Sequence, residues 1–160
     1  MNDRALFDEV DGPRLGEIGL QQFPPYLMNR IMGRYNASLR ADLAAVGLSI
    51  PKMRSLAVLS VADGLTIGRL AVLAVVEQST LSRALDGLEA EGLVRRVPDP
   101  EDSRATRIAI TDEGRARFEA VWPTMRANYA RMFAGVSAEE QAAFVGTLGK
   151  MLNNVRRHDF

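Results

Sequence analysis

The stretch from Ser79 to Thr111 changes its hydrophobic period partway along, and this change restricts the possible folds more than any other feature. Apolar residues follow a helical spacing from Ser79 to about Glu91, and Gly92 then ends the helix. Two short segments with strand character follow, Leu93–Val97 and Arg107–Thr111, and the second alternates in polarity as a half-buried strand does. A helix followed directly by a hairpin predicts a small antiparallel ribbon packed among helices.

Helical spacing of apolar residues also accounts for most of the remaining chain. Thr66 and Thr111 are placed to cap helices, and Ser137-Ala-Glu-Glu140 has the form of a capping box. Pro24 and Pro25 are expected to break or restart the first helix near its beginning, and Pro123 is expected to kink the helix that contains it. The further helices are expected at about Ile18–Val46, Pro51–Val61 and Ile67–Leu73, from Thr111 through Met132, and from Ser137 through Val155.

These elements predict a fold that is mainly α with a small β-hairpin. Two short helices followed by a two-stranded hairpin form the arrangement of a winged helix-turn-helix, which we place at residues 51–111. Long helices at 18–46 and 112–156 flank it within one domain that covers 1–160. The turn Ala74-Val-Val-Glu77 lacks the glycine that such turns often contain, so the sequence leaves its backbone geometry open.

The composition narrows the chemistry open to the chain. It contains no cysteine, which excludes thiolate chemistry and Cys-based metal sites. Its one histidine, His158, cannot by itself form a catalytic triad or a metal site with several His ligands. Adjacent carboxylates such as Glu139-Glu140 do not face each other on a helix, so we expect neither an enzyme nor a cofactor. The longest apolar run, Leu70–Val76, is far too short to cross a bilayer. We therefore expect a cytoplasmic protein without membrane association.

The predicted helix from Ser79 to Glu91 is amphipathic, and its polar arc suits DNA. The apolar arc consists of Leu81, Ala84, Leu85 and Leu88, and the opposite arc of Ser79, Ser82, Arg83, Asp86 and Gly87. Hydroxyl groups bind phosphates or bases, and an arginine fork fits O6 and N7 of guanine in the major groove. We expect the free amides at the start of this helix to suit a phosphate, and Gly87 and Ala90 to permit close approach of the DNA backbone.

The loop between the two predicted strands supplies a second group of candidate contacts. Pro98–Arg104 is too long and too charged for a simple turn, and it projects Arg104 beyond the strands. A narrow minor groove concentrates negative potential and attracts an inserted arginine. The carboxylates of this loop would repel phosphate, but one of them can orient an arginine instead. Asp102 is the candidate for this structural role in the wing, with Arg104 or Arg107 as its partner.

Three stretches of the sequence resemble the MarR (multiple antibiotic resistance regulator) family. Ser79–Arg96, Asp99–Arg104 and Ile110–Arg115 are similar to its recognition helix, wing and post-wing helix. Leu88–Arg96 follows the pattern Leu-Glu-x-x-Gly-Leu-Val-x-Arg, and Thr111-x-x-Gly114 matches the family's Leu-Thr-x-x-Gly with isoleucine at the first position. The resemblance implies DNA contacts in the two grooves from Ser79, Thr80, Ser82 and Arg83 on the helix and from Arg104 on the wing.

The resemblance covers about residues 18–156 and also implies partners. It predicts a homodimer, held by the first helix and the last two, that binds double-stranded DNA at a palindromic operator as a repressor or, less often, an activator. It further implies release by a small aromatic or phenolic effector in a cleft between the dimerisation helices and the winged lobe, where a cation and apolar walls are needed. Residues of suitable type are Tyr26, Arg30, Tyr35 and Met53. The bulky residues interpreted instead as dimer or core packing include Phe118, Trp122, Tyr129, Phe133 and Phe144.

The charge balance of the predicted lobe keeps an alternative open. Thr66–Thr111 contains six Arg and seven acidic residues, which offers little long-range attraction for DNA. A winged-helix module that binds a protein instead of DNA would have this balance. Affinity for DNA would otherwise depend on a few well-placed arginines and on the presence of two copies.

Overall fold

The computed structural model describes residues 12–102 and 104–156, so that His158 lies outside the described residues. The chain divides into two compact units, with the boundary between Ser38 and Leu39. The first unit contains α1 (Leu15–Ile18), the 3-10 turn η2 (Leu20–Gln22) and the beginning of α2 (Pro24–Ala45). The expected restart of the first helix at Pro24 and Pro25 is therefore confirmed, and its bounds are Pro24–Ala45 rather than about Ile18–Val46. Gly19 adopts a positive φ of 78°, and the helix begins anew at the proline pair, since proline is tolerated in a first helical turn.

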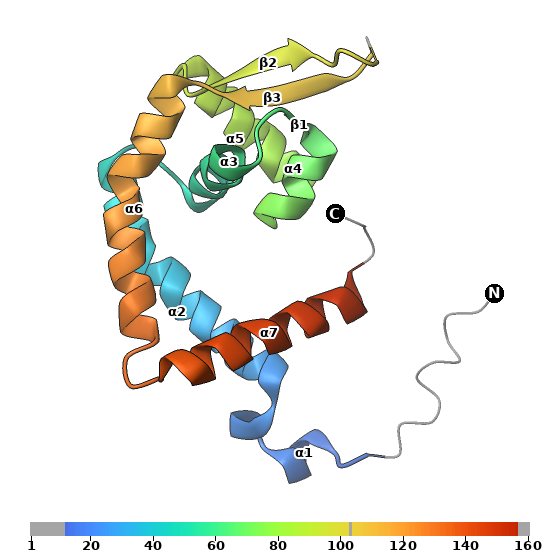
Figure 1. The fold of residues 1–160 in the computed structure, drawn as a ribbon, viewed down its shortest axis with the longest axis vertical. Coiled ribbons are helices and arrows are strands. Elements are labelled where there is room, and N and C mark those ends of the chain that lie inside the picture. The colour runs from blue at the N-terminus through green and yellow to red at the C-terminus, as the bar shows by residue number, and fades with distance from the viewer. Residues whose placement is uncertain (1–11, 103, 157–160) are drawn as a thin grey trace, which may run out of the picture. The chain divides into compact units, whose positions relative to one another are not determined.

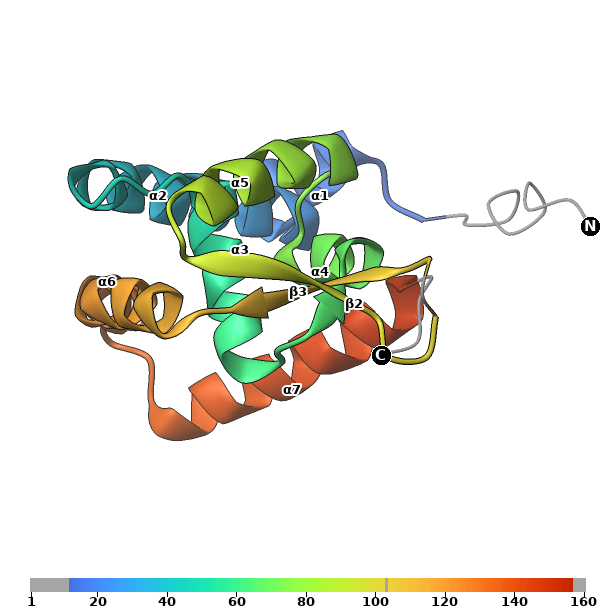
Figure 2. The same cartoon turned by 90° about the horizontal axis from the view of Figure 1, so that it is seen from above.

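The second unit is built around a winged lobe, residues 50–110, that confirms the predicted fold class (Figure 1). Leucines from its three helices meet in a core where several side chains are fully buried, with Ile108 of the sheet packed against them. Figure 2 shows the sheet lying beside these helices and its two longer strands extending beyond them. The elements of the lobe are α3 (Ile50–Val61), β1 (Leu65–Thr66), α4 (Ile67–Ala74), α5 (Gln78–Ala90), β2 (Val94–Pro98) and β3 (Thr106–Ile110).

The sheet has three strands, where the sequence predicted a hairpin of two. Its antiparallel order is β1-β3-β2, with Leu65 opposite Ile108 and Thr66 opposite Arg107. The two-residue β1 is too short to show a strand period, which explains why the sequence did not reveal it. Each long strand is also displaced by one residue from its prediction, because Leu93 closes the end of α5 and Thr111 caps the next helix.

Side-chain caps fix the helix boundaries where the sequence placed them. Thr66 Oγ1 accepts from the amide of Arg69 at 3.4 Å, and Thr111 Oγ1 accepts from that of Gly114 at 3.0 Å. Ser137 forms the predicted capping box with Glu140. The helices that begin after the last two caps are α6 (Asp112–Met132), which continues through Pro123, and α7 (Ala138–Val155).

The turn between α4 and α5 depends on a left-handed valine rather than a glycine. Val75 has φ 52° and ψ 51°, and its carbonyl accepts from Arg54 Nη1 at 3.1 Å. A β-branched residue in this conformation carries steric strain on the order of 1–2 kcal/mol. The side chain is 77% exposed, so little packing compensates for that strain.

Val75→Gly is therefore expected to raise the free energy of unfolding by about 0.5–1 kcal/mol. This is less than the full strain because glycine also increases the conformational entropy of the unfolded chain. Urea denaturation of the wild type and the variant measures this difference. Val75→Ala is the control, because alanine keeps a Cβ in the left-handed conformation and should gain less. A glycine variant less stable than the wild type would contradict the assignment of strain to this turn.

The C-terminal part of the second unit leaves apolar side chains uncovered. α7 has no buried residue, and it contacts the end of α6 through rings whose centroids lie 6.2 Å apart, Phe133 and Phe144. The exposed large apolar residues on these two helices are Trp122, Tyr129, Met132, Phe144, Val145, Met151, Leu152 and Val155.

The described residues contain neither an unbroken membrane-spanning helix nor a cluster of metal ligands. No single helix in this part of the chain is long and apolar enough to cross a bilayer. α2 and α3 reach the necessary length and apolar composition only when they are counted together as one bent pair. No group of three or more His, Cys, Asp or Glu side chains in the same residues could hold a metal ion.

Candidate nucleic-acid interface

The polar face of α5 presents the side chains that the sequence analysis selected on this helix. Leu81, Leu85 and Leu88 are fully buried on its inner face. On the other side Ser79, Thr80 and Arg83 are exposed and Ser82 is half-buried. The predicted contacts on α5 thus share one accessible surface, whereas Arg104 lies apart from them at the tip of the wing.

The N-terminus of α5 is closed by a carboxylate, contrary to the expectation of free amides. Glu77 Oε2 accepts from the backbone N–H groups of Ser79 at 3.1 Å and Thr80 at 3.2 Å, and the Ser79 hydroxyl also donates to it. The hydrogen bond from that hydroxyl, together with those from the amides, lowers the pKa of Glu77 below its ordinary value. A negative charge therefore occupies the position that we expected a phosphate to take.

Gly87 on α5 leaves room for a lysine of the neighbouring helix. A Cβ at this position would lie 2.9 Å from Cε and Nζ of Lys52, which crosses from α3. Lys52 Nζ also pairs with the carboxylate of Glu91 at 2.5 Å. The absence of a side chain at residue 87 thus gives this lysine its path to Glu91, and the approach of DNA at Gly87 stays a prediction.

Asp99, which was not singled out, holds the base of the wing. Its side chain is buried, and Oδ2 pairs with Arg107 Nε at 2.6 Å while Oδ1 accepts from the amide of Glu101 at 2.8 Å. These bonds lower the pKa of Asp99 below its ordinary value, and the bond from the amide of Glu101 has the largest effect. Arg107 also donates to the carbonyl of Gly64 at 2.9 Å. The carboxylate that orients Arg107 is therefore Asp99, not Asp102.

Asp102 lies beside the other arginine that was proposed as its partner. Its Oδ1 accepts from the backbone N–H of Arg104 at 3.0 Å and lies 3.6 Å from Nε of the same residue. The Arg104 side chain is 93% exposed, so this ion pair is weak and the guanidinium points into solvent. The wing therefore presents Arg104 at its tip and fixes its backbone locally.

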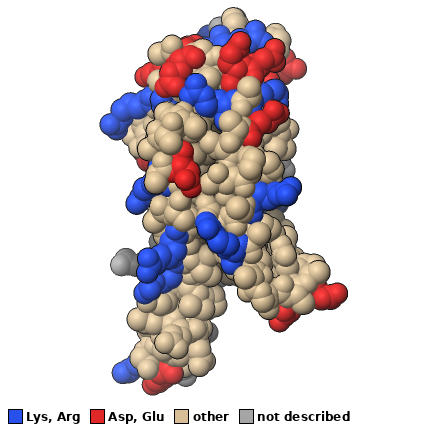
Figure 3. Space-filling view, turned by 90° about the vertical axis from the view of Figure 1, so that its left-hand side faces the viewer, with Lys and Arg blue, Asp and Glu red and all other residues tan. Residues whose placement is uncertain are grey.

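Ion pairs within the lobe absorb much of its acidic charge. Arg96 pairs with Asp86 at 2.7 Å and also with Glu89. These partners raise the pKa of Arg96 above its ordinary value, mainly through the hydrogen bond to Asp86. Arg83 and Arg95 are exposed and make no ion pair within the described residues. Acidic and basic side chains consequently alternate over the upper end of the face drawn in Figure 3. Pairing leaves the net charge of the lobe unchanged, and it leaves Arg83 and Arg95 accessible on the surface.

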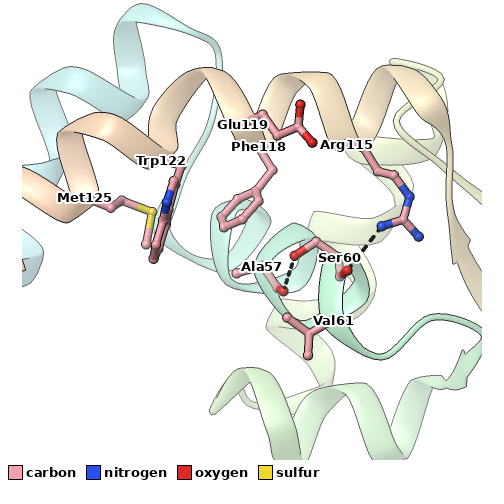
Figure 4. Close-up of a pocket in the computed structure, with 8 residues that line it drawn as sticks. All are labelled: Ala57, Ser60, Val61, Arg115, Phe118, Glu119, Trp122 and Met125. Carbon is pink, nitrogen blue, oxygen red and sulfur yellow. Dashed lines mark hydrogen bonds between the residues drawn. The ribbon is translucent and has the colours of Figure 1, made fainter.

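A pocket of about 460 Å³ lies between α3 and α6. In Figure 4, Arg115, Phe118 and Trp122 project from α6 toward the end of α3, and Arg115 Nη1 donates to the carbonyl of Ser60 at 3.1 Å. Val61 at its edge is 90% exposed, unusual for a large apolar side chain. The residues that line it are Ala57, Ser60, Val61, Arg115, Phe118, Glu119, Trp122 and Met125.

None of the four predicted effector residues lines this pocket. Met53 is buried in the core of the winged lobe. In the first unit, Arg30 Nη1 donates to the hydroxyl of Tyr26 at 2.9 Å one turn away on α2, and burial raises the pKa of Tyr35. A recognisable signal was present on α6, where Arg115, Phe118, Trp122 and Met125 follow a helical stripe, but the aromatic residues were interpreted as packing alone.

Comparison with known proteins points to one family. A model described as the MarR family matches residues 46–105. A crystal structure of a MarR-family transcriptional regulator from Silicibacter pomeroyi is 57% identical, with a TM-score of 0.88, over 92% of this chain and 100% of that one. The transcriptional repressor IacR of Pseudomonas putida is 29% identical over 89% of this chain and 83% of its own length.

A third relative carries a ligand in its solved structure. The MarR-family protein Rv2887 of Mycobacterium tuberculosis, in complex with p-aminosalicylic acid, is 29% identical to this chain. The match has a TM-score of 0.64 and covers 79% of this chain and 96% of that one.

Proposed function

Because this chain belongs to the MarR family of transcriptional regulators, we propose that it acts as a homodimeric repressor that binds a palindromic DNA operator. The observation that carries the proposal is the exposed polar face of α5 together with the extended Arg104 of the wing. The helix enters the major groove, where Ser82 and Arg83 meet base edges, and Arg104 enters the adjacent minor groove.

The dimer is supported by the uncovered apolar surface of the C-terminal helices. α7 buries none of its residues within the described chain, and side chains such as Leu152 and Val155 are exposed on it. Monomeric proteins rarely leave a contiguous apolar face of this kind in water. A second copy of the chain covers this face and places two α5 helices on one operator.

Selection from random oligonucleotides tests this function. We expect an enriched inverted repeat whose two halves are one helical turn apart, bound more weakly as salt rises. Analytical ultracentrifugation should give one dimer per operator. The absence of an enriched repeat, affinity that does not change with salt, and tolerance of Ser82→Glu would together favour the protein-binding alternative.

Glu77→Gln is expected to tighten operator binding about 3-fold, because it removes a negative charge close to phosphates while the amide oxygen still caps α5. Fluorescence anisotropy at fixed salt measures the change. Glu139→Gln on α7 is the matched control, since it makes the same charge change at another helix start. Equal effects of the two substitutions would show that net charge, not the position of Glu77, is responsible.

The effector site is assigned to the α3–α6 pocket. Its walls are mainly apolar, with Ser60 and Glu119 as further polar residues, and Arg115 supplies a cation that pairs with a carboxylate, which suits a small aromatic acid such as the one bound by Rv2887. Trp122 is the only tryptophan of the chain and lines the pocket. Addition of p-aminosalicylate should therefore change its fluorescence in a saturable way in the wild type and not in Arg115→Met.

A further inference from the structure

Asp63, in the turn after α3, contacts an arginine of the pocket with one carboxylate oxygen and a backbone amide of the sheet with the other. Oδ2 lies 3.5 Å from Nη2 of Arg115, which lines the α3–α6 pocket. Oδ1 accepts from the backbone N–H of Ile110 at 2.9 Å, at the end of β3, and from that of Gly64, also at 2.9 Å. A change in the position of this carboxylate therefore acts on β3 directly.

The same turn bonds to the base of the wing. The carbonyl of Gly64 accepts from Arg107, whose guanidinium pairs with Asp99. Asp99 in turn accepts from the amides of Glu101 and Asp102 in the wing tip. A continuous series of polar contacts thus leads from Arg115 in the pocket to the loop that carries Arg104.

The third strand makes this connection stiff. β1 follows Gly64 immediately and pairs with β3, so that Leu65 lies opposite Ile108. The turn is held to the wing by this pairing, by Asp63 and by Arg107 at once. Packed elements with several bonds transmit a displacement rather than absorb it.

We propose that Asp63 is a positioning residue that couples the α3–α6 pocket to the wing. The proposal rests on the proposed function, because it assigns the route by which an anion in the pocket weakens DNA binding. A carboxylate bound in the pocket takes the Arg115 guanidinium from Asp63, which then loosens the amide of Ile110 and the base of the wing. The pair is half-exposed and long, so the exchange is easy and the coupling small, about 5-fold in operator affinity.

Hydrogen exchange of the full chain without ligand or DNA tests the route itself. Arg115→Met removes the partner of Asp63 as a bound anion would, and the amides of Ile110, Glu101 and Asp102 should exchange about 3-fold faster. Arg117→Met is the matched control. Arg117 lies two residues away on α6 and anchors the helix to the carbonyl of Val46 at 2.8 Å, without contact to Asp63. It should leave exchange in the wing unchanged.

Asp63→Asn separates the ion pair from the turn, since asparagine keeps an oxygen for both amides. It should speed exchange in the wing as much as Arg115→Met does, and the double variant should add nothing further. Equal effects of the two arginine substitutions, no effect of either, or additive effects of Asp63→Asn and Arg115→Met would overturn the proposal. Circular dichroism of each variant identifies any loss of fold, and Asp63→Asn remains informative if Arg115→Met does not fold.

DNA binding with p-aminosalicylate as the probe separates this proposal from the function on which it rests. Wild type should lose about 5-fold in operator affinity at saturation, and Asp63→Asn should lose none although Trp122 still reports binding. If the Arg115→Met and Asp63→Asn variants exchange faster in the wing but selection returns no operator, the proposed regulator function is refuted and the coupling stands. If p-aminosalicylate lowers operator affinity equally in wild type and Asp63→Asn, the regulator function stands and the coupling is refuted.

Discussion

Replacing Gly114 with alanine is expected to lower the free energy of unfolding by about 3 kcal/mol, the upper end of the usual cost of overpacking. Gly114 is buried in the first turn of α6, where a Cβ would overlap the carbonyl oxygen of Leu93 and lie 2.9 Å from Cγ1 of Ile110. The clash is with backbone, which cannot rotate away. The same carbonyl accepts from the amide of Thr111 at 3.1 Å, so a shift would also break the bond that joins α6 to the sheet.

Urea denaturation compares this variant with Gly68→Ala. Gly68 is a helical glycine of the same lobe, exposed on α4, and a Cβ added there would meet no atom of the described residues within 4 Å. Alanine there should change the stability by less than about 0.5 kcal/mol, or raise it slightly through helix propensity. Equal stabilities of the two variants would mean that α6 does not approach the carbonyl of Leu93 as closely as the structure shows.

The parts of the fold that depend on local chemistry could be predicted from the sequence. Thr66, Thr111 and Ser137 each cap the helix for which they were proposed, because a cap and its amides are neighbours in sequence. The order of helices and the position of the wing follow from hydrophobic period and turn residues in the same way. The pattern Thr111-x-x-Gly114 combines a cap with a close approach to Leu93, which is a physical reason for its form.

Features that depend on distant partners were missed or misassigned. β1 exists because β3, about 40 residues later, pairs with it. Arg107 pairs with Asp99 rather than Asp102 because Arg107 lies opposite Val97 in the β2–β3 pairing, only two residues before Asp99. Glu77 was counted only as one of several acidic residues, and its role as the cap of α5 became visible once the helix was seen to begin at Gln78.

The candidate sites show the same division. Ser79, Thr80, Ser82 and Arg83 reach the surface together because a helical wheel needs only the period of one helix. The pocket, in contrast, is formed by two helices that are separated by more than 50 residues, and the sequence does not state which of their faces meet. Met53 was selected for its type alone and lies instead in the core. The DNA contacts and the effector residues both remain predictions to be tested on variants.

Arg104→Ala is expected to weaken operator binding by about 1–3 kcal/mol for each protomer, so that the dimer loses roughly twice that amount. The side chain is 93% exposed and its pair with Asp102 is 3.6 Å long, so the guanidinium enters a minor groove without giving up a strong partner. Each lost contact should also reduce the dependence of affinity on salt by about one counterion. Anisotropy titrations at several salt concentrations measure both quantities.

Two further substitutions separate the position of this arginine from its charge. Arg126→Ala removes the same charge from an exposed residue of α6 and should change operator affinity by less than about 2-fold. Arg104→Lys keeps the charge but loses the planar fork, so it should restore the salt dependence and only part of the affinity. An Arg104→Ala protein that binds its operator as tightly as the wild type would place the wing outside the minor groove, and the selectivity of this protein would then rest on α5 alone.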